Sequence, residues 1–515
     1  MWGIDVLATV GSCTIVGIEP LAVDVEVDVS PGLPTFEIVG LPGTAVREAR
    51  ERVRTALRNA GFRMPPGRIT VNLAPAHLPK TDTLFDLPIA LGVLVAAGHL
   101  RPAIPLSSLL VVGELSLDGS VRPVRGAFCI AARLRRSRRI FVLPAGNFAE
   151  VSQIPEVLAY PVDSLEQMVA VLGEGSEPLC TPGAALHSPR QVRSGQREWL
   201  EIRGQLAAKR ALEIAAAGGH HLLLIGPPGA GKTSLARALA AVAPELTPDE
   251  AMEVTQIHSV AGLLSESEPS VRARPFRAPH HTVTLAGLLG GGRMPRPGEV
   301  SLAHRGFLFL DEFAEFPVRV LEGLRQPLEE GRVVLSRAGG TVAFPASFSL
   351  IAATNPCPCG FLGDPKLECT CTESARRQYA RRLSGPLLDR IDLVSYVHRP
   401  DVDDVLAARG EDEGIETVRD RVREARARQE RRFASAVKLN GGMLPEEIAR
   451  SVVLDEAGSH LLREAARRWA LSPRALHRLL RVARTIADLN GREAVLSDDV
   501  AEALSYRFST HNLAT

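Results

Sequence analysis

Hydrophobic residues in the first third of the chain follow two different periods. Apolar residues alternate with polar ones from Val23 to Val29, which is the period of a strand with one buried face. From Thr44 to Asn59 apolar residues recur at helical spacing, while charges fill the other face. Strands are predicted at 23–29, 35–39 and 68–73, and helices at 44–59 and 85–98. Residues 1–175 are therefore expected to form a compact α/β domain.

The pattern changes twice further along the chain. From Gly173 to Gln196 prolines and glycines are frequent and periodicity is weak, as in an interdomain linker. Apolar strands and helices resume at Trp199, and from Asp401 the pattern is helical. A length of 515 residues is also long for a single core. We expect a linker at 176–198, an α/β core at 199–400 and a helical domain at 401–515.

The stretch from His220 to Thr233 reads as an apolar strand, a glycine-rich turn and the start of a helix. Glycines let the backbone wrap around phosphate oxygens, and the helix N-terminus behind them favours negative charge. Lys232 is placed to reach the β- and γ-phosphates, and the Thr233 hydroxyl to bind Mg²⁺. The alternative is a plain turn between strand and helix, but the full G-x-x-x-x-G-K-T pattern lies in the context that a P-loop requires. The predicted cofactors are ATP and Mg²⁺, held by Gly226, Pro227, Pro228, Gly229, Ala230, Gly231, Lys232, Thr233, Ser234 and Asp311.

Polar residues end two further apolar strands. The strand 306–310 runs into Asp311 and Glu312. Asp311 is predicted to hold the Mg²⁺ shell, and Glu312 is predicted to act as general base toward the attacking water. Another strand ends at Asn355, whose amide is placed to orient that water. Arg390 follows in an Asp-Arg-Ile-Asp run. It is either a salt-bridged helix residue or an arginine finger for a neighbouring subunit, and its order behind the other motifs favours the finger.

Four of the seven cysteines lie in one short segment. So few cysteines in so long a chain do not form a disulfide scaffold, so clustered ones are interpreted as reduced thiols or metal ligands. A tetrahedral zinc ion would close the segment into a loop, although C-x-C pairs are less diagnostic than C-x-x-C pairs and four reduced thiols remain the alternative. The candidate zinc ligands are Cys357, Cys359, Cys369 and Cys371.

Composition restricts the partners only weakly. The formal net charge is +1, so a nucleic-acid surface has to be a local basic patch. Candidates for DNA contact are Arg337, at the tip of a predicted hairpin, and Arg277 and Arg293, in a second loop with a weaker signal. The start of the chain has no basic n-region, and the longest apolar stretch is shorter than the ~20 residues that span a bilayer. We expect a cytoplasmic protein with no membrane partner.

Two segments of the first domain resemble the proteolytic domain of Lon-type proteases, which has a ribosomal-S5-like α/β fold. They are Phe85 to Ala90, and Gly113 to Gly119 followed by Val124-Arg125-Gly126. In that family a Ser nucleophile begins the helix and a Lys follows the second segment, and here Asp86 and Phe128 fall near those places. A nucleophile needs a hydroxyl or thiol beside a base, so no peptidase activity is expected.

Three later segments resemble the magnesium-chelatase-like AAA+ ATPases of bacteria. They read RPFRAPHHT at 274–282, PGEVSLAHRG at 297–306 and NPCPCG at 355–360. The match is nearest to the competence-associated ComM/YifB branch and covers nearly the whole chain. The resemblance implies an AAA+ P-loop core with a C-terminal helical lid, assembled as a hexameric ring with ATP sites between subunits. It also implies a DNA branch-migration helicase that acts on single-stranded or branched DNA in homologous recombination or natural transformation, with recombination proteins as partners.

The same resemblance assigns roles to single residues. Arg474, after a Ser-Pro helix start, resembles the second sensor of an AAA+ lid near the γ-phosphate, and it completes a catalytic set with Glu312, Asn355 and Arg390. In helicase-type relatives the hairpin that carries Arg337 projects into the central channel, while a place on the ring exterior is the alternative. A chelatase-type or protein-remodelling ATPase remains the rival function, because a fold alone does not decide activity.

Overall fold

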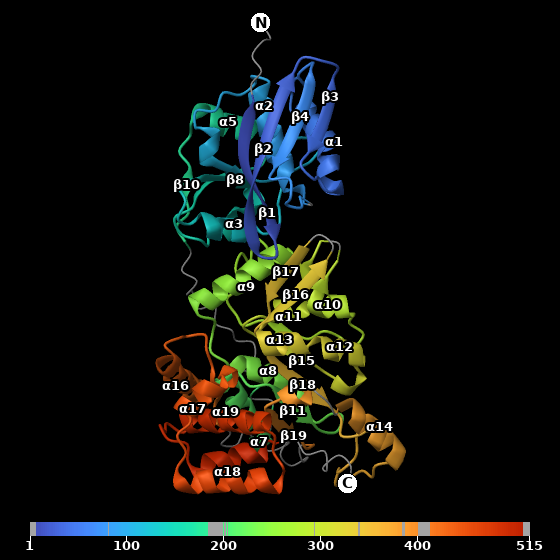
Figure 1. Cartoon of the computed structure of the whole chain (residues 1–515), viewed down its shortest axis with the longest axis vertical. Helices are drawn as coiled ribbons and strands as arrows, with labels where there is room; N and C mark the ends of the chain where they lie inside the picture. Colours follow the sequence, from blue (N-terminus) through green and yellow to red (C-terminus); the bar gives the residue numbers. More distant parts are fainter. Residues whose placement is uncertain are drawn as a thin grey trace.

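The computed structural model describes residues 7–80, 82–183, 199, 202, 204–292, 294–337, 340–383, 387–399 and 413–507, with the backbone alone at 337 and 383. The molecule is elongated (Figure 1). An N-terminal unit (residues 7–183) lies at one end, a P-loop unit (204–399) in the middle, and a helical unit (413–507) at the other end. No helix in the described part of the chain is long and apolar enough to cross a membrane.

The described part of the N-terminal unit contains two four-stranded sheets and a short pair of strands, β6 (Glu114–Leu115) and β7 (Val121–Arg122). The first has the order β1 (Ala8–Val16), β2 (Glu19–Ser30), β4 (Arg68–Ala74) and β3 (Thr35–Val39), and the second β10 (Leu179–Cys180), β9 (Leu158–Val162), β8 (Ile140–Pro144) and β5 (Leu109–Val111). The helices are α1 (Thr44–Asn59), α2 (Asp86–Ala96), α3 (Ala127–Leu134), α4 (Phe148–Val151) and α5 (Leu165–Glu174). The alternating residues Val23, Val25 and Val27 are buried, as their period predicts.

The N-terminal unit also differs from the sequence prediction at both ends. Strand β1 was not predicted. Strand β10 lies inside the segment that was assigned to the linker, yet it pairs with β9 in register Leu179↔Ala159. The linker assignment therefore starts too early, because residues 179–180 belong to a sheet.

One parallel sheet organises the P-loop unit. Its order is β12 (Phe276–Arg277), β15 (Phe307–Leu310), β18 (Ser349–Thr354), β11 (Leu222–Ile225) and β19 (Leu393–Tyr396). The flanking helices include α7 (Leu206–Gly218), α8 (Lys232–Val242), α9 (Pro248–Ala261), α13 (Arg325–Glu330) and α14 (Glu373–Leu383). Ile225 pairs with Thr354, and Leu310 with Ala352, so the carboxyl ends of three strands meet at one edge. Ligands bind at this edge in open α/β sheets.

The predicted hairpin is present. Strands β16 (Arg332–Arg337) and β17 (Gly340–Pro345) pair antiparallel, and a shorter pair is formed by β13 (Gly290–Gly291) and β14 (Arg296–Pro297). Strand β17 lies against the turn between β1 and β2. A Cβ added to Gly17, which has φ +68°, would lie 2.9 Å from the Ala343 carbonyl oxygen. The hairpin therefore touches the N-terminal unit along one strand.

A second contact joins α9 to the N-terminal unit. The Ser259 hydroxyl donates to Glu150 Oε2 at 2.7 Å, and Gly126 N donates to Ser259 O at 3.2 Å. The Cys129 thiol donates to the Gln256 carbonyl at 3.4 Å. The start of α3 is thus docked on one face of α9 (Figure 1).

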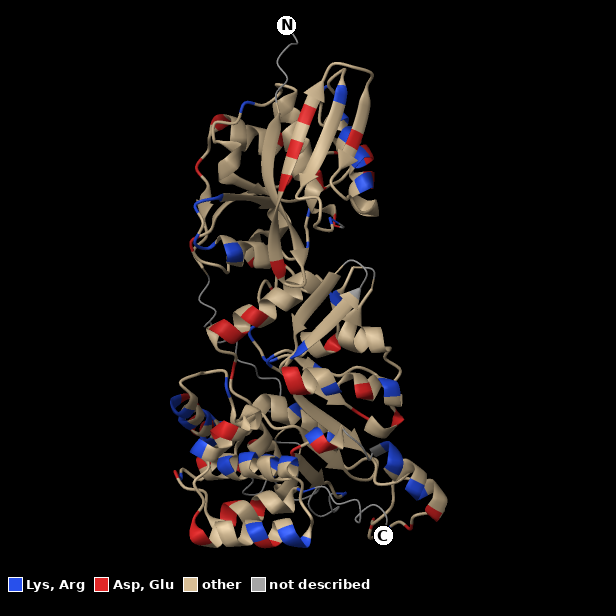
Figure 2. Cartoon of the chain, viewed as in Figure 1, with Lys and Arg blue, Asp and Glu red and all other residues tan. Residues whose placement is uncertain are grey.

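The helical unit packs against α7 and mixes both signs of charge. It comprises α16 (Ile415–Phe433), α17 (Pro445–Ser451), α18 (Glu456–Arg468), α19 (Pro473–Leu489) and α20 (Ser497–Ser505). Figure 2 shows basic and acidic positions interspersed along these helices. Several arginines of α16 turn toward the core. Arg421 Nε donates to Glu213 Oε1 at 2.5 Å, and Arg426 donates to the Ala216 carbonyl at 2.7 Å, so both are part of the packing against α7.

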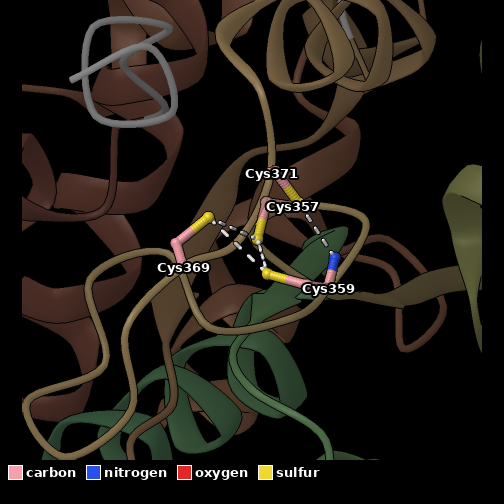
Figure 3. A group of neighbouring side chains, drawn as sticks. All are labelled: Cys357, Cys359, Cys369 and Cys371. Atoms are coloured by element: carbon pink, nitrogen blue, oxygen red, sulfur yellow. Dashed lines mark hydrogen bonds between the residues drawn. The ribbon is translucent and has the colours of Figure 1, made fainter.

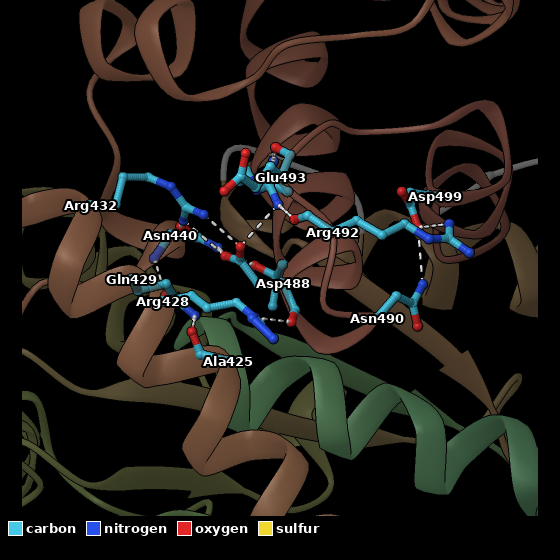
Figure 4. A network of polar contacts seen from close by, with 12 residues as sticks. Ala425, Arg428, Gln429, Arg432, Asn440, Asp488, Asn490, Arg492, Glu493 and Asp499 are labelled. Carbon is cyan, nitrogen blue, oxygen red and sulfur yellow. Dashed lines mark hydrogen bonds and ion pairs between the residues drawn. The ribbon is translucent and has the colours of Figure 1, made fainter.

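A buried polar network ties this unit together (Figure 4). Asp488 accepts hydrogen bonds from Arg432 at 2.5 and 2.8 Å, from Asn440 Nδ2 at 2.8 Å and from Arg484 Nη2 at 2.9 Å. Asn440 also donates to Thr485 Oγ1 at 3.1 Å, and His220 Nε2 lies 2.8 Å from the same hydroxyl. His220 is two residues before β11, so the network reaches the strand that leads into the P-loop.

Candidate nucleotide-binding site

The glycine-rich loop joins β11 to α8 as its sequence predicts. Gly229 and Gly231 have φ +78° and +84°, and a Cβ on either would meet no atom within 4 Å. Glycine adopts this left-handed conformation without strain, so the loop curves around open space. Gly231 is the N-cap of α8, whose first N–H groups have no partner within the helix. The loop is thus a cradle that an anion fits.

Lys232 lies at the centre of this loop. Its Nζ donates to the carbonyls of Gly226 at 2.6 Å and Pro227 at 2.9 Å, and to Asn355 Oδ1 at 3.1 Å. Burial lowers the pKa of the ammonium, while Asp311 and Glu312 act in the opposite direction. Lys232 and Asn355, which the sequence separates by 123 residues, are therefore side by side.

Thr233 and Asp311 are also brought together. The Thr233 hydroxyl donates to Asp311 Oδ2 at 2.9 Å, and the Glu312 N–H donates to Asp311 Oδ1 at 2.9 Å. A hydroxyl and a carboxylate beside a phosphate-sized cradle are oxygen ligands of the kind that Mg²⁺ prefers. The residues present fit a nucleotide with its magnesium ion.

Glu312 has a partner that the sequence interpretation missed. His281 Nδ1 lies 3.2 Å from Glu312 Oε2, and Glu312 itself has φ +52°. Non-glycine residues in this conformation are uncommon and cluster at functional sites. The sequence offers one signal for His281, its place in the RPFRAPHHT segment at 274–282.

Arg390 and Arg474 share one carboxylate. Arg474 Nη2 lies 2.9 Å from Glu329 Oε1, and Arg390 Nη2 donates to the same oxygen. Hydrogen bonds from Arg474 and Arg390 lower the pKa of Glu329. The Arg390 side chain is nearly buried, whereas that of Arg474 is half exposed. The two arginines therefore meet at one carboxylate, although 84 residues separate them.

Of the three arginines predicted to contact DNA, the structure describes the side chain of one. Arg277 forms a two-bond pair with Glu299, at 2.7 and 2.8 Å, so its guanidinium already has a partner within the chain. Arg293 lies outside the described residues, and the side chain of Arg337 does too. A DNA contact at either of these two arginines stays a prediction.

The N-terminal unit holds a buried salt bridge at Asp86, the residue that the resemblance to Lon-type proteases aligns near a nucleophile. Asp86 is buried and accepts from Arg52 Nε at 2.7 Å, from Arg52 Nη2 at 2.9 Å and from Leu115 N at 3.2 Å. Burial raises the pKa of Asp86, while Arg52 acts in the opposite direction. Phe128 is buried beside α9, where its N–H lies 3.4 Å from Ser259 Oγ. The Asp86 carboxylate is held by Arg52, and Phe128 carries no titratable group; the lack of peptidase activity stays a prediction.

The four clustered cysteines converge within one loop (Figure 3). Their sulfur atoms lie within 4.8 Å of one another. Cys357 is buried and the other three are half buried. This is an arrangement that could hold a metal ion.

A parallel sheet whose strand, glycine-rich loop and helix carry Lys232 and Thr233 defines the P-loop class of proteins. Within that class, family models assign the chain further. The model described as "Magnesium chelatase, subunit ChlI" matches residues 198–405, "Subunit ChlI of Mg-chelatase" matches 25–147, and "Magnesium chelatase, subunit ChlI C-terminal" matches 412–507. The chain belongs to this magnesium-chelatase family.

Full-length relatives place it more closely. It is 42% identical over 503 residues to an uncharacterized protein of Mycobacterium tuberculosis, covering 96% of this chain and 97% of the relative. It is 41% identical to the competence protein ComM of Haemophilus influenzae over 505 residues and to YifB of Salmonella typhimurium over 502, covering 97% of each chain. The match to the magnesium-chelatase 67 kDa subunit of Chlorobaculum tepidum is 28% over 162 residues, 30% of this chain and 23% of that one. The chain is therefore a ComM/YifB-like member of the family.

Proposed function

We propose that this protein is an ATP-hydrolysing AAA+ motor that moves along DNA, acting as a branch-migration helicase in homologous recombination or natural transformation. The observation that carries the proposal is the convergence of Lys232, Thr233, Asp311 and Asn355 at one edge of a parallel sheet, in a chain 41% identical over its length to a protein named for competence. ATP and Mg²⁺ are the proposed cofactors.

Each residue of the site has a distinct task. Lys232 binds phosphate oxygens. The neighbouring oxygens of Thr233 and Asp311 would hold the metal ion, which would neutralise part of the phosphate charge. Glu312 accepts a proton from water, and His281 orients its carboxylate. Asn355 is hydrogen-bonded to Lys232, so its amide is positioned beside the same phosphate site.

Arg390 and Arg474 act on a neighbouring subunit in this proposal. They share Glu329, so the two positive charges lie close together, with Arg474 half exposed and Arg390 nearly buried. A heterologous contact that repeats around an axis closes into a ring, and each pocket would then receive the arginines of the next subunit. We propose a hexamer on the resemblance to ring-forming ATPases.

The nucleotide steps are tested with two variants of the full-length protein. Lys232→Ala should weaken binding of a fluorescent ATP analogue, whereas Glu312→Gln should bind it normally but hydrolyse ATP at least 100-fold more slowly, since a general base supplies about 10² to 10⁴ in rate. Glu315→Gln, a nearby exposed carboxylate with an ion pair to Arg382, is the matched control and should leave turnover unchanged. Normal turnover by Glu312→Gln would refute the assigned base.

The DNA step needs a separate assay. We expect single-stranded or branched DNA to stimulate ATP hydrolysis and the protein to move a labelled branch only with hydrolysable ATP. The rival function, a chelatase-type or protein-remodelling ATPase, is favoured by the family models and the partial match to a chelatase subunit. Stimulation by a tetrapyrrole or a protein partner, with no response to DNA, would support the rival.

A further inference from the structure

The four sulfur atoms of the loop 357–371, the four-cysteine loop, lie within 4.8 Å of one another, and three of them are nearly equally spaced. Cys357 Sγ lies 3.4 Å from Cys359 Sγ and 3.7 Å from Cys369 Sγ, and the last two are 3.6 Å apart. A disulfide requires about 2.05 Å between sulfurs. Thiolates bound at about 2.3 Å to one tetrahedral ion lie roughly 3.8 Å from one another. The distances therefore match a site for a single ion.

Backbone amides already point at two of these sulfurs. Cys359 N donates to Cys371 Sγ at 3.3 Å, and Leu362 N donates to Cys357 Sγ at 3.3 Å. Four thiolates around a divalent ion leave an excess negative charge, which N–H donors in the surrounding shell offset. Among the described residues, this is the one group of three or more Cys, His, Asp or Glu side chains close enough together to share an ion.

The four-cysteine loop also packs against the P-loop. A Cβ added to Gly360 would lie 2.6 Å from Pro228 Cδ, so the turn packs directly against the nucleotide cradle. Arg399 bridges the same two segments. Its Nη2 lies 3.4 Å from the Pro228 carbonyl, and its guanidinium lies over the Phe361 ring, 5.4 Å from the centroid.

The loop begins where the sensor strand ends. Asn355, which accepts a hydrogen bond from Lys232, precedes Cys357 by two residues. Closing the loop around an ion fixes the backbone on the carboxyl side of Asn355. The turn at Gly360, which packs against Pro228, then also fixes the position of the P-loop at that residue. A tetrahedral set of four soft thiolates is typical of zinc or of iron–sulfur centres, and a closed Cys₄ site is the common form of structural zinc.

We propose that the four-cysteine loop binds one zinc ion through all four thiolates, and that the closed loop holds Asn355 and Pro228 in place for nucleotide binding. The first half stands without any DNA activity. The second half rests on the proposed nucleotide binding, and it makes the metal content of the protein a determinant of ATP affinity.

The full-length protein, purified without chelator, tests the first half by elemental analysis. We expect about one zinc per chain, since a closed four-ligand site is the structural kind. The double variant Cys369→Ser/Cys371→Ser should lose it. The matched control Cys180→Ser removes an exposed free thiol outside the loop and should keep it. Zinc-free wild-type protein that stays empty when zinc is added back would overturn the proposal.

Binding of a fluorescent ATP analogue, measured without DNA, tests the second half. Metal-stripped wild type and the double variant should bind at least tenfold more weakly than Cys180→Ser, and added zinc should restore only the wild type. If the double variant does not fold, Gly360→Ala replaces it, because this change disturbs the Pro228 contact and keeps all four thiols. Analogue affinity equal to wild type in stripped protein and in Gly360→Ala would refute the coupling. Failure of unaltered wild type to bind the analogue would instead refute the proposed function, while the zinc content still answers the first half.

Discussion

Removing the carboxylate of Asp488 should destabilise the helical unit strongly. Asp488 is 1% exposed and Arg484 is 0% exposed, and the same carboxylate also accepts from Arg432 and Asn440. Asp488→Ala leaves the buried Arg484 guanidinium without a charged partner, with only the carbonyls of Arg492 and Glu493 as acceptors. Breaking one side of a buried ion pair costs about 3–5 kcal/mol, whereas an exposed pair contributes at most about 1 kcal/mol. The matched control is Asp420→Ala, because that carboxylate is 63% exposed and pairs with Arg423 on the helix surface.

Amide hydrogen exchange is the appropriate assay, because a chain of several units does not unfold in one step. Protection of α19 in Asp488→Ala should fall roughly 100-fold to several thousand-fold, which corresponds to about 3–5 kcal/mol. The loss should extend to His220 and the start of β11, since Thr485 bonds both to His220 and to Asn440. Equal protection of α19 in Asp488→Ala and Asp420→Ala would show that the network does not hold this unit together.

Three further changes test other parts of the structure. His281→Ala should lower kcat about tenfold and leave KM unchanged, since it removes the residue that orients Glu312; a change in KM alone in steady-state assays would contradict that role. Glu329→Gln removes the negative charge that both arginines share and should lower the ATP concentration for half-maximal hydrolysis by up to about fivefold, as an exposed pair is worth up to about 1 kcal/mol; a fall in kcat would mean that Glu329 positions them instead. Arg52→Leu strands the buried Asp86 carboxylate and should lower the free energy of opening of α2, measured by amide hydrogen exchange, by about 3–5 kcal/mol, with unchanged protection of α2 as the contrary result.

Features that depend on neighbours in sequence were predictable. The P-loop, the acidic strand end and the hairpin each occupy a continuous stretch, so period and turn residues were enough to place them. Strand β1 was missed because it includes buried polar residues. The Ser12 hydroxyl donates to the Val111 carbonyl of the second sheet, and Thr14 donates to the Pro79 carbonyl, so polar residues stand where a strand pattern expects apolar ones.

Pairings between distant residues were not predictable. Nothing in a single sequence joins Glu329 to Arg474 across 145 positions or His281 to Glu312 across 31. The contact of Arg426 in α16 with the end of α7 was not predictable either, because a long side chain can reach across a helix interface to an unpaired carbonyl.

The N-terminal unit rests on the P-loop unit at two separate places, the Gly17 turn on β17 and the start of α3 on α9. Two separate contacts prevent this unit from rotating about either one alone. A conformational change that moved the hairpin relative to α9 would have to tilt the N-terminal unit or break one of the two contacts. A pair of fluorescent labels, one on the N-terminal unit and one on the helical unit, would report such a tilt as a change in the distance between the labels.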